Sequence, residues 1–260
     1  MSIPKKIHYC WFGGNPLPES ALKCIESWEK YCPDYEIVEW NESNFDVNCC
    51  AYTKEAYEAK KWAFVTDYVR LYVLKNYGGI YMDTDVEVLK SLDRFLNNKA
   101  FSGFETSCTI PTGIMGAEKE SSWISYLLSY YDNSHFILED GSMNLTTNVQ
   151  TITDMTKEKY KVDLVGNLLD IKDVVSIYPK EYFCPKEYET GRIKITEDTY
   201  TIHHFNASWH SDNEKMYRNE LNRYTRILGK NVGGKFVSLK FNLQKNGLRN
   251  TIKKIIEYKR

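Results

Sequence analysis

Two aspartates separated by one residue, Asp83 and Asp85, end a short apolar run that follows the glycine pair Gly78-Gly79. In an extended segment, residues i and i+2 point to the same face, so we expect the two carboxylates to converge. Two like charges at about 4 Å repel by about 1 to 4 kcal/mol, depending on the effective dielectric constant. A hard divalent cation best relieves this repulsion, although a solvated turn is the alternative. Since glycines admit a ligand close to the backbone, the pattern predicts a metal site that holds a phosphorylated substrate.

A second polar group, Thr66-Asp67 with Arg70, lies on a predicted helix before the aspartates. Positions i and i+3 share a helix face. Asp67 and Arg70 therefore either contact a ribose hydroxyl and a phosphate, or form a simple ion pair worth a few tenths of a kcal/mol.

Aromatic and histidine residues flank this region in the sequence. Trp11 ends the first predicted strand, where its ring either stacks on a nucleobase, for about 1 to 3 kcal/mol, or packs in the core. Near residue 205, either His203 or His204 could add an imidazole to the carboxylates. Neighbouring residues of a strand point to opposite faces, so we expect only one of the two to face the metal. Ser208 and the Trp209 indole could donate hydrogen bonds to phosphate oxygens.

The composition predicts a folded protein in a reducing compartment. Hydrophobic residues make up 42% of the 260 residues, which favours a core and argues against disorder. The seven cysteines are odd in number and lack C-x-x-C spacing, which argues against a disulfide scaffold or a zinc site. We find no run of about 18 apolar residues and no signal-peptide pattern. We therefore expect a cytoplasmic protein.

The order of the predicted elements is that of an α/β protein. Strands are expected over 6–12 and 35–40, and helices over 18–31 and 54–77, before the strand that carries the aspartates. Alternating strands and helices predict a parallel sheet that binds its ligand at the carboxyl ends of the strands. Further strands are expected over 100–104, 113–117, 174–178 and 199–205, and further helices over 123–131 and 149–159.

Four blocks of the sequence resemble glycosyltransferase family 32, whose members transfer sugars and contain a D-x-D motif. Their order and spacing carry the resemblance, which extends more distantly to the large clostridial glucosylating toxin domains. The blocks are IPKKIHYCWFGG (3–14), FVTDYVRLY (64–72), GGIYMDTDVEVL (78–89) and IHHFNASW (202–209).

This resemblance implies a GT-A-type α/β fold, with a central, mostly parallel sheet flanked by helices. It implies a retaining transfer of a sugar from a nucleotide-sugar donor, with UDP favoured over GDP. The acceptor would be a glycan or a lipid-linked precursor in capsular or cell-surface polysaccharide synthesis. The nucleotide-sugar site that it implies consists of Cys10, Trp11, Thr66, Asp67, Arg70, Tyr81, Asp83, Ser208 and Trp209.

The resemblance also implies the metal site. Asp85 would bind Mn²⁺ or Mg²⁺ directly, and Asp83 would contact the ribose and a metal-bound water. His204 is the expected third ligand, because the Phe205-Asn206-Ala207 segment follows it as in related transferases. Asp83, Asp85 and Arg70 are thus the expected catalytic residues, and no general base or nucleophile is assigned.

The C-terminal part of the chain is strongly basic. Residues 215–260 contain 13 Lys+Arg and 2 Asp+Glu, whereas the rest of the chain has a net charge of −12. We therefore expect a catalytic domain over 1–213 and a basic helical appendage over 214–260. Apolar residues recur in it at helical spacing, at Val237, Phe241, Leu248, Ile252 and Ile255. Such a helix lies on the inner face of an anionic membrane or packs against the acidic body. Nucleic-acid binding is not expected, since no recognised module accompanies the charge.

Two other functions remain as alternatives. A phosphohydrolase of the haloacid-dehalogenase type also places D-x-D after an apolar strand, and Asp83 would then be its nucleophile. That motif usually opens the chain and requires a later lysine and acidic pair. A non-catalytic protein that binds a nucleotide sugar would keep the site but would not turn over its ligand.

Overall fold

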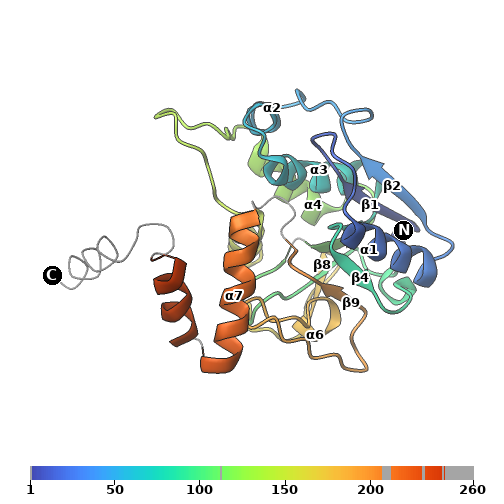
Figure 1. Ribbon diagram of the computed structural model, residues 1–260. Helices are drawn as coiled ribbons and strands as arrows, with labels where there is room; N and C mark the ends of the chain where they lie inside the picture. The colour runs from blue at the N-terminus through green and yellow to red at the C-terminus, as the bar shows by residue number, and fades with distance from the viewer. Residues whose placement is uncertain (1, 112, 207–211, 230–231, 242, 244–260) are drawn as a thin grey trace. The chain divides into compact units, whose positions relative to one another are not determined.

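The computed structural model describes residues 2–111, 113–206, 212–229, 232–241 and 243 (Figure 1). It divides into two compact units. The first comprises Met1–Pro185 and Ile195–His204, and the second comprises Lys186–Lys194 and Phe205–Arg260. No helix in the described part of the chain is long and apolar enough to cross a membrane. The domain boundary expected after residue 213 stays a prediction.

The first unit is built on a seven-stranded mixed sheet. Its strands β2, β1 and β3 are parallel, as are β5 and β8, whereas β6 and β7 pair with their neighbours antiparallel. In sheet order the strands are β2 (Glu36–Trp40), β1 (Lys6–Cys10), β3 (Gly79–Met82), β6 (Ile114–Ala117), β5 (Ala100–Gly103), β8 (Val175–Tyr178) and β7 (Leu169–Ile171). The predicted α/β class with a central sheet is confirmed.

Helices complete the first unit on both faces of this sheet. In β3, Ile80 and Met82 belong to one buried cluster, and Tyr81 belongs to another. Because successive strand residues point to opposite faces, both faces of β3 are covered. Trp28 of α1 packs in the first cluster, and Val69 of α3 packs in the second. The helical segments are α1 (Glu19–Tyr31), α2 (Ala51–Glu58), α3 (Trp62–Tyr77), η1 (Asp93–Phe95), α4 (Ser122–Leu128), η2 (Ser129–Tyr131), α5 (Asn148–Tyr160) and α6 (Lys180–Phe183).

The helix expected over 54–77 is two helices, α2 and α3. Lys60, between them, has a left-handed backbone with φ of 56°. The Lys61 N–H donates to the Ala56 carbonyl at 2.9 Å, which closes the end of α2. Since a left-handed residue interrupts the helical path, α3 starts afresh at Trp62. Its polar residues Thr66, Asp67 and Arg70 thereby belong to a helix of its own.

Gly78 and Gly79 join α3 to β3 and are packed against protein. Both have positive φ, 66° and 103°. A Cβ on Gly78 would lie 2.7 Å from the backbone nitrogen of Lys119, and one on Gly79 would lie 2.8 Å from the Lys6 carbonyl oxygen. The expectation that these glycines admit a ligand is therefore wrong: they allow the backbone to turn tightly into the sheet.

A small two-stranded sheet brings a late segment back to the aspartates. Its strands, β4 (Val86–Val88) and β9 (Thr201–His203), are antiparallel, and His203 lies opposite Val86. The Trp28 indole N–H donates to the Val86 carbonyl at 2.7 Å and anchors β4 to α1. This pairing sets which late side chains reach the Asp83–Asp85 turn.

The second unit contains α7 (Asp212–Leu228), a helix over residues 232–241, and the hairpin 186–194 closed by a Lys186–Ile193 bridge. In the 232–241 helix, Val237 is fully buried, and the Phe241 ring lies 4.9 Å from the ring of Tyr217 on α7. These two apolar residues therefore pack within the unit instead of facing outward. Leu248, Ile252 and Ile255 lie outside the described residues.

Candidate functional site

The aspartates converge through a turn and not through strand alternation. β3 ends at Met82, and the Val86 N–H donates to the Asp83 carbonyl at 3.0 Å across a tight turn. The Asp83 N–H donates to the Gly113 carbonyl at 2.9 Å and fixes the start of the turn. The predicted convergence of Asp83 and Asp85 is thus present, but the extended geometry expected for them is wrong.

His203 joins the two aspartates. One ligand atom from each of Asp83, Asp85 and His203 lies within 4.8 Å of the others. The His203 Nε2 is 3.3 Å from the Asp85 Oδ1. Its ring packs closely on Gly113, where a Cβ would lie 2.9 Å from Nδ1. Two carboxylates and one imidazole are a donor set that suits Mn²⁺ and related divalent ions, so these residues fit the expected metal.

His204 points away from this cluster. Its Nε2 lies 2.8 Å from the Glu87 Oε2, and its backbone N–H donates to the Asp85 carbonyl at 2.9 Å. The choice of His204 as third ligand is therefore corrected to His203. The physical reason is the antiparallel register of β4 and β9, which turns the side chain of His203 toward Asp85.

The two neighbouring histidines provide a matched test. We expect His203→Gln to weaken Mn²⁺ binding about ten-fold or more, because it removes a ligand atom from the cluster. His204→Gln should change Mn²⁺ affinity less than about three-fold, since its partner is a part-exposed carboxylate. Mn²⁺ titration followed by electron paramagnetic resonance measures both, and equal losses would contradict the assignment.

Arg70 is buried beneath the aspartates. Its side chain is 5% exposed, with Nη2 at 3.1 Å from the Asp67 Oδ1 and Nη1 at 3.3 Å from the Asp83 Oδ1. The guanidinium also lies over the Tyr81 ring at 4.7 Å, and the Tyr81 hydroxyl donates to the Asp83 Oδ1 at 2.9 Å. Arg70 Nε donates to the Thr66 carbonyl at 3.3 Å. The i,i+3 pair is thus part of a buried network that orients Asp83.

The charges in this network are tuned by burial. Burial raises the pKa of Asp67 to about 7, although the neighbouring Arg70 favours the carboxylate. Burial acts to lower the pKa of Arg70, but Asp83, Tyr81, Asp67 and Cys10 together outweigh it and raise this pKa above its ordinary value. Burial also raises the pKa of Tyr81, which keeps its phenol protonated as a donor. Arg70 therefore stays a cation, whereas Asp67 titrates near neutral pH.

The expected nucleobase site lies at the carboxyl end of β1. Cys10 is buried, and burial raises the pKa of its thiol, so it remains uncharged. Trp11 is partly exposed, and its indole N–H donates to the Asn15 carbonyl at 2.6 Å. The stacking role of Trp11 and the contact to the Cys10 backbone stay predictions. Ser208 and Trp209, expected at the diphosphate, lie outside the described residues.

Sequence reasoning missed two residues near the cluster. Glu105 follows β5, and burial raises the pKa of its carboxyl, while His203 and Lys180 favour its charged form and Asp83 opposes it. Cys184 is the second residue: burial acts to lower the pKa of His203, but Asp85 and Cys184 favour its charged form and this pKa is raised overall. Neither residue belongs to a motif, and only their long-range placement beside His203 reveals them.

Comparisons with known proteins find similarity to proteins that are named as sugar transferases. Residues 18–102, which include both aspartates, match the family described as glycosyltransferase sugar-binding region containing DXD motif. Inositol phosphoceramide mannosyltransferase 3 of Schizosaccharomyces pombe is 30% identical over an alignment of 126 residues that covers 45% of this chain and 34% of that protein. Mannosyl phosphorylinositol ceramide synthase CSH1 of Saccharomyces cerevisiae is 28% identical over 44% of this chain and 31% of its own length. The chain thus spans about a third of these curated relatives, and the resemblance to DXD-containing sugar transferases is confirmed.

Solved structures of glycosyltransferases are also similar to this chain. PaToxG glycosyltransferase aligns with a TM-score of 0.49 and 19% identity, over 62% of this chain and 71% of its own. Galactosyltransferase LgtC, in complex with donor and acceptor sugar analogues, aligns with a TM-score of 0.43 and 14% identity, over 84% of this chain and 95% of its own.

Proposed function

We propose that this protein is a metal-dependent glycosyltransferase that moves a sugar from a nucleotide-sugar donor to a glycan or lipid-linked acceptor. The observation that carries the proposal is the cluster of Asp83, Asp85 and His203, with Arg70 buried behind it. This cluster supplies what breaking a sugar–diphosphate bond requires, which is a place for a divalent cation and a fixed positive charge. The family match over residues 18–102 supports the same activity.

The residues of the cluster have separate tasks. Asp85 and His203 would hold Mn²⁺ or Mg²⁺, which as a Lewis acid stabilises the negative charge that grows on the departing diphosphate. Tyr81 and Arg70 hold the Asp83 carboxylate in one orientation through contacts of 2.9 and 3.3 Å. Because these partners are buried and already in place, Asp83 needs no reorganisation when donor binds.

The proposal also covers donor binding, the stereochemistry of transfer and the acceptor. Trp11 stacks on the base, and the Thr66–Arg70 segment contacts the nucleotide and sugar. Transfer retains the anomeric configuration, with UDP as the favoured nucleotide. The names of the curated relatives specify mannosyl transfer to inositol phosphoceramide, so mannosyl donors belong in the substrate panel. The acceptor is a cell-surface glycan precursor at the inner face of a membrane.

Thermal stabilisation by nucleotide and metal tests this proposal directly. We expect UDP with Mn²⁺ to raise the Tm by about 5 to 10 °C at 100 times the dissociation constant, because a ligand at that level adds about 2.7 kcal/mol. UDP without metal, and GDP with Mn²⁺, should give smaller shifts. Differential scanning fluorimetry of the full chain measures the Tm with UDP and with GDP, each with and without Mn²⁺.

The outcomes of this measurement separate the candidate functions. A metal-dependent shift followed by sugar release from a donor panel supports the transferase. A shift without any turnover would favour the non-catalytic binding protein. No shift with either nucleotide would reject the nucleotide-sugar site, and hydrolysis of a phosphate ester by Asp83 would then be assayed.

A further inference from the structure

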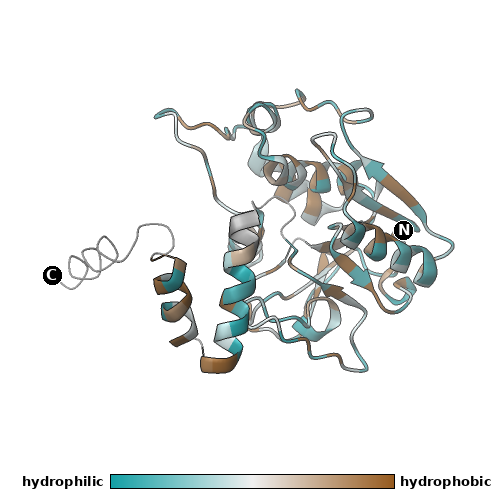
Figure 2. Cartoon of the chain, in the orientation of Figure 1, coloured by the Kyte–Doolittle hydropathy of each residue, from teal (hydrophilic) through white to brown (hydrophobic). Residues whose placement is uncertain are grey.

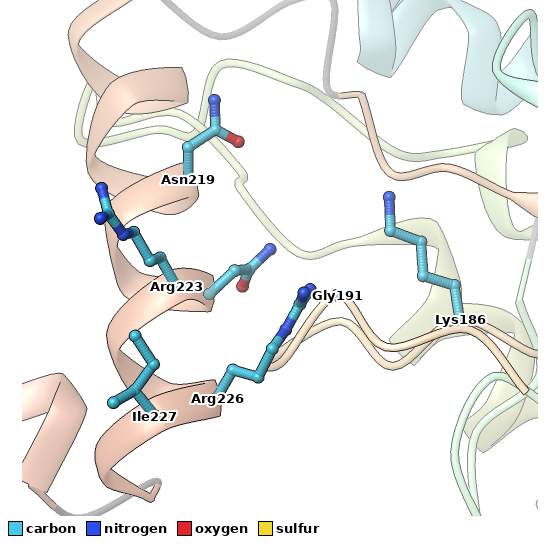
Figure 3. Close-up of a pocket in the computed structure, with 7 residues that line it drawn as sticks. Lys186, Gly191, Asn219, Arg223, Arg226 and Ile227 are labelled. Atoms are coloured by element: carbon cyan, nitrogen blue, oxygen red, sulfur yellow. The ribbon is translucent and has the colours of Figure 1, made fainter.

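A cationic pocket lies within the second unit, between α7 and the 186–194 hairpin (Figure 3). Its volume is about 380 Å³, at the lower end of the range for small-ligand sites. Three of its seven lining residues are cations, two are amides, and none is a carboxylate. The lining residues are Lys186, Gly191, Asn219, Asn222, Arg223, Arg226 and Ile227.

The hairpin and the helix fix each other around this pocket. Arg226 donates from Nε and Nη2 to the Thr190 carbonyl at 3.2 and 3.0 Å. With its side-chain amide oriented so that the nitrogen faces the hairpin, Asn222 donates to the carbonyls of Tyr188 and Glu189, at 3.1 and 2.8 Å. Gly191, with φ of 64°, lets the hairpin pass close to Arg226, since a Cβ there would lie 3.3 Å from Nη2. The walls of the pocket are therefore built before any ligand arrives.

The donors of the pocket match a phosphate group. A guanidinium carries five N–H donors, and the two bonds to Thr190 leave three of those on Arg226 for a ligand. Figure 3 shows Lys186 on the hairpin across from α7 and Arg226 pointing from α7 toward the hairpin, whereas Arg223, one turn earlier, extends away from the hairpin. Arginine and lysine together, with the Asn219 amide and without a carboxylate, favour a phosphate oxyanion over a neutral ligand.

Exposed apolar side chains lie at the end of α7 and on the 232–241 helix, and of these Ile227 lines the pocket. Ile227 both lines the pocket and is 66% exposed, and Leu228 next to it is also exposed. Val232, Phe236 and Leu239 are exposed as well, and their spacing places them on one face of the 232–241 helix. Figure 2 shows this hydrophobic colour at the end of α7 and on the helix that follows. Apolar residues beside cations are typical of a surface that enters the headgroup region of a membrane.

We propose that this pocket binds the phosphate of an anionic phospholipid headgroup, while Ile227 and the exposed apolar residues that follow it in the sequence contact the acyl boundary. The excess of 13 Lys+Arg over 2 Asp+Glu in residues 215–260 supplies the complementary charge. The inference goes beyond the proposed sugar transfer and does not depend on it. In this proposal the protein holds an anionic lipid at one defined phosphate site and not only by a diffuse attraction between charges.

Two double variants with equal loss of charge test this site. Lys186→Gln with Arg223→Gln removes two cations from the pocket, one from the hairpin and one from α7. Lys194→Gln with Lys235→Gln removes two cations of the same unit that do not line it. Binding of the full chain to phosphatidylcholine vesicles that contain phosphatidic acid is measured by flotation at 0.15 M and 0.5 M salt. We expect the pocket variant to bind at least about ten-fold more weakly than the control, since hydrogen bonds to charged groups are lost.

The salt series and a soluble ligand distinguish the alternatives. At 0.5 M salt, diffuse attraction is screened, so the control should approach the wild type while the defect of the pocket variant persists. Equal losses in the two variants, or no binding to these vesicles, would overturn the proposal. Glycerol phosphate serves as a soluble probe of the same pocket, and its binding to the wild type and both variants is measured by calorimetry. If glycerol phosphate binds and the pocket variant weakens that binding, while the vesicles do not bind, the site takes soluble phosphates and the lipid assignment is wrong. Circular dichroism of each variant verifies that the helices are retained.

Discussion

Replacing Asp85 with asparagine is expected to lower kcat/KM for sugar transfer by about 10² to 10³-fold. The substitution keeps the size of the side chain but removes the charge that the cluster offers to a divalent ion. The free energy of unfolding should change by less than about 1 kcal/mol, because Asp85 lies in a turn beside solvent and not in the core. Initial rates with a nucleotide-sugar panel, at increasing Mn²⁺, measure the loss and any rescue by excess metal.

Glu87→Gln is the matched control for this experiment. Glu87 lies two residues further along the same segment, but its carboxylate pairs with His204 at 2.8 Å and takes no part in the Asp83–Asp85–His203 cluster. We expect the kcat/KM of Glu87→Gln to stay within about five-fold of the wild type, because a part-exposed ion pair contributes no more than about 1 kcal/mol. Comparable losses at Asp85 and Glu87 would mean that total negative charge matters, and that the cluster is not the metal site.

The aspartates were predictable because their signal is local. A repeated acidic residue after an apolar run is visible within a few positions, and so is the helix that carries Asp67 and Arg70. Their geometry was less predictable. Alternation suggested a continuous strand, whereas the hydrogen bond from Val86 to Asp83 ends β3 and makes a turn. A single backbone hydrogen bond decides between these two arrangements, and residue types alone do not report it.

The choice between His203 and His204 depends on a pairing across more than a hundred residues. Strand alternation predicts that only one of them faces the metal, but the register of β4 against β9 decides which. Glu105 reaches the same place from the loop after β5 for a similar reason. The hairpin 186–194 likewise joins the C-terminal helices, although it is separated from them by the segment that forms β9. Contacts of this kind arise from topology, which no local pattern encodes.

Replacing Arg70 with methionine is expected to lower the free energy of unfolding by about 3 kcal/mol at pH 8, and to abolish most transfer activity. Methionine fills much of the same space, but it leaves Asp67 and Asp83 without the cation that both contact. The deficit should shrink as the pH falls toward 5. Asp67 has a folded-state pKa of about 7, above its ordinary value of 3.8, so the folded protein gains a proton there that the unfolded chain does not hold. Urea unfolding of wild type and variant at pH 5 and pH 8 measures the change.

A second substitution separates charge from packing in this result. In the Arg70→Met background, Asp67→Asn removes one of the two uncompensated carboxylates while keeping the side-chain volume. If charge causes the instability, the double variant should recover at least about 1 kcal/mol at pH 8 and little at pH 5, where Asp67 is already protonated. If the lost hydrogen bonds from Arg70 to Thr66 dominate, the double variant should be no more stable than Arg70→Met at either pH. The first outcome would establish that the Arg70 cation maintains the fold by neutralising Asp67 and Asp83, of which Asp83 belongs to the Asp83–Asp85–His203 cluster.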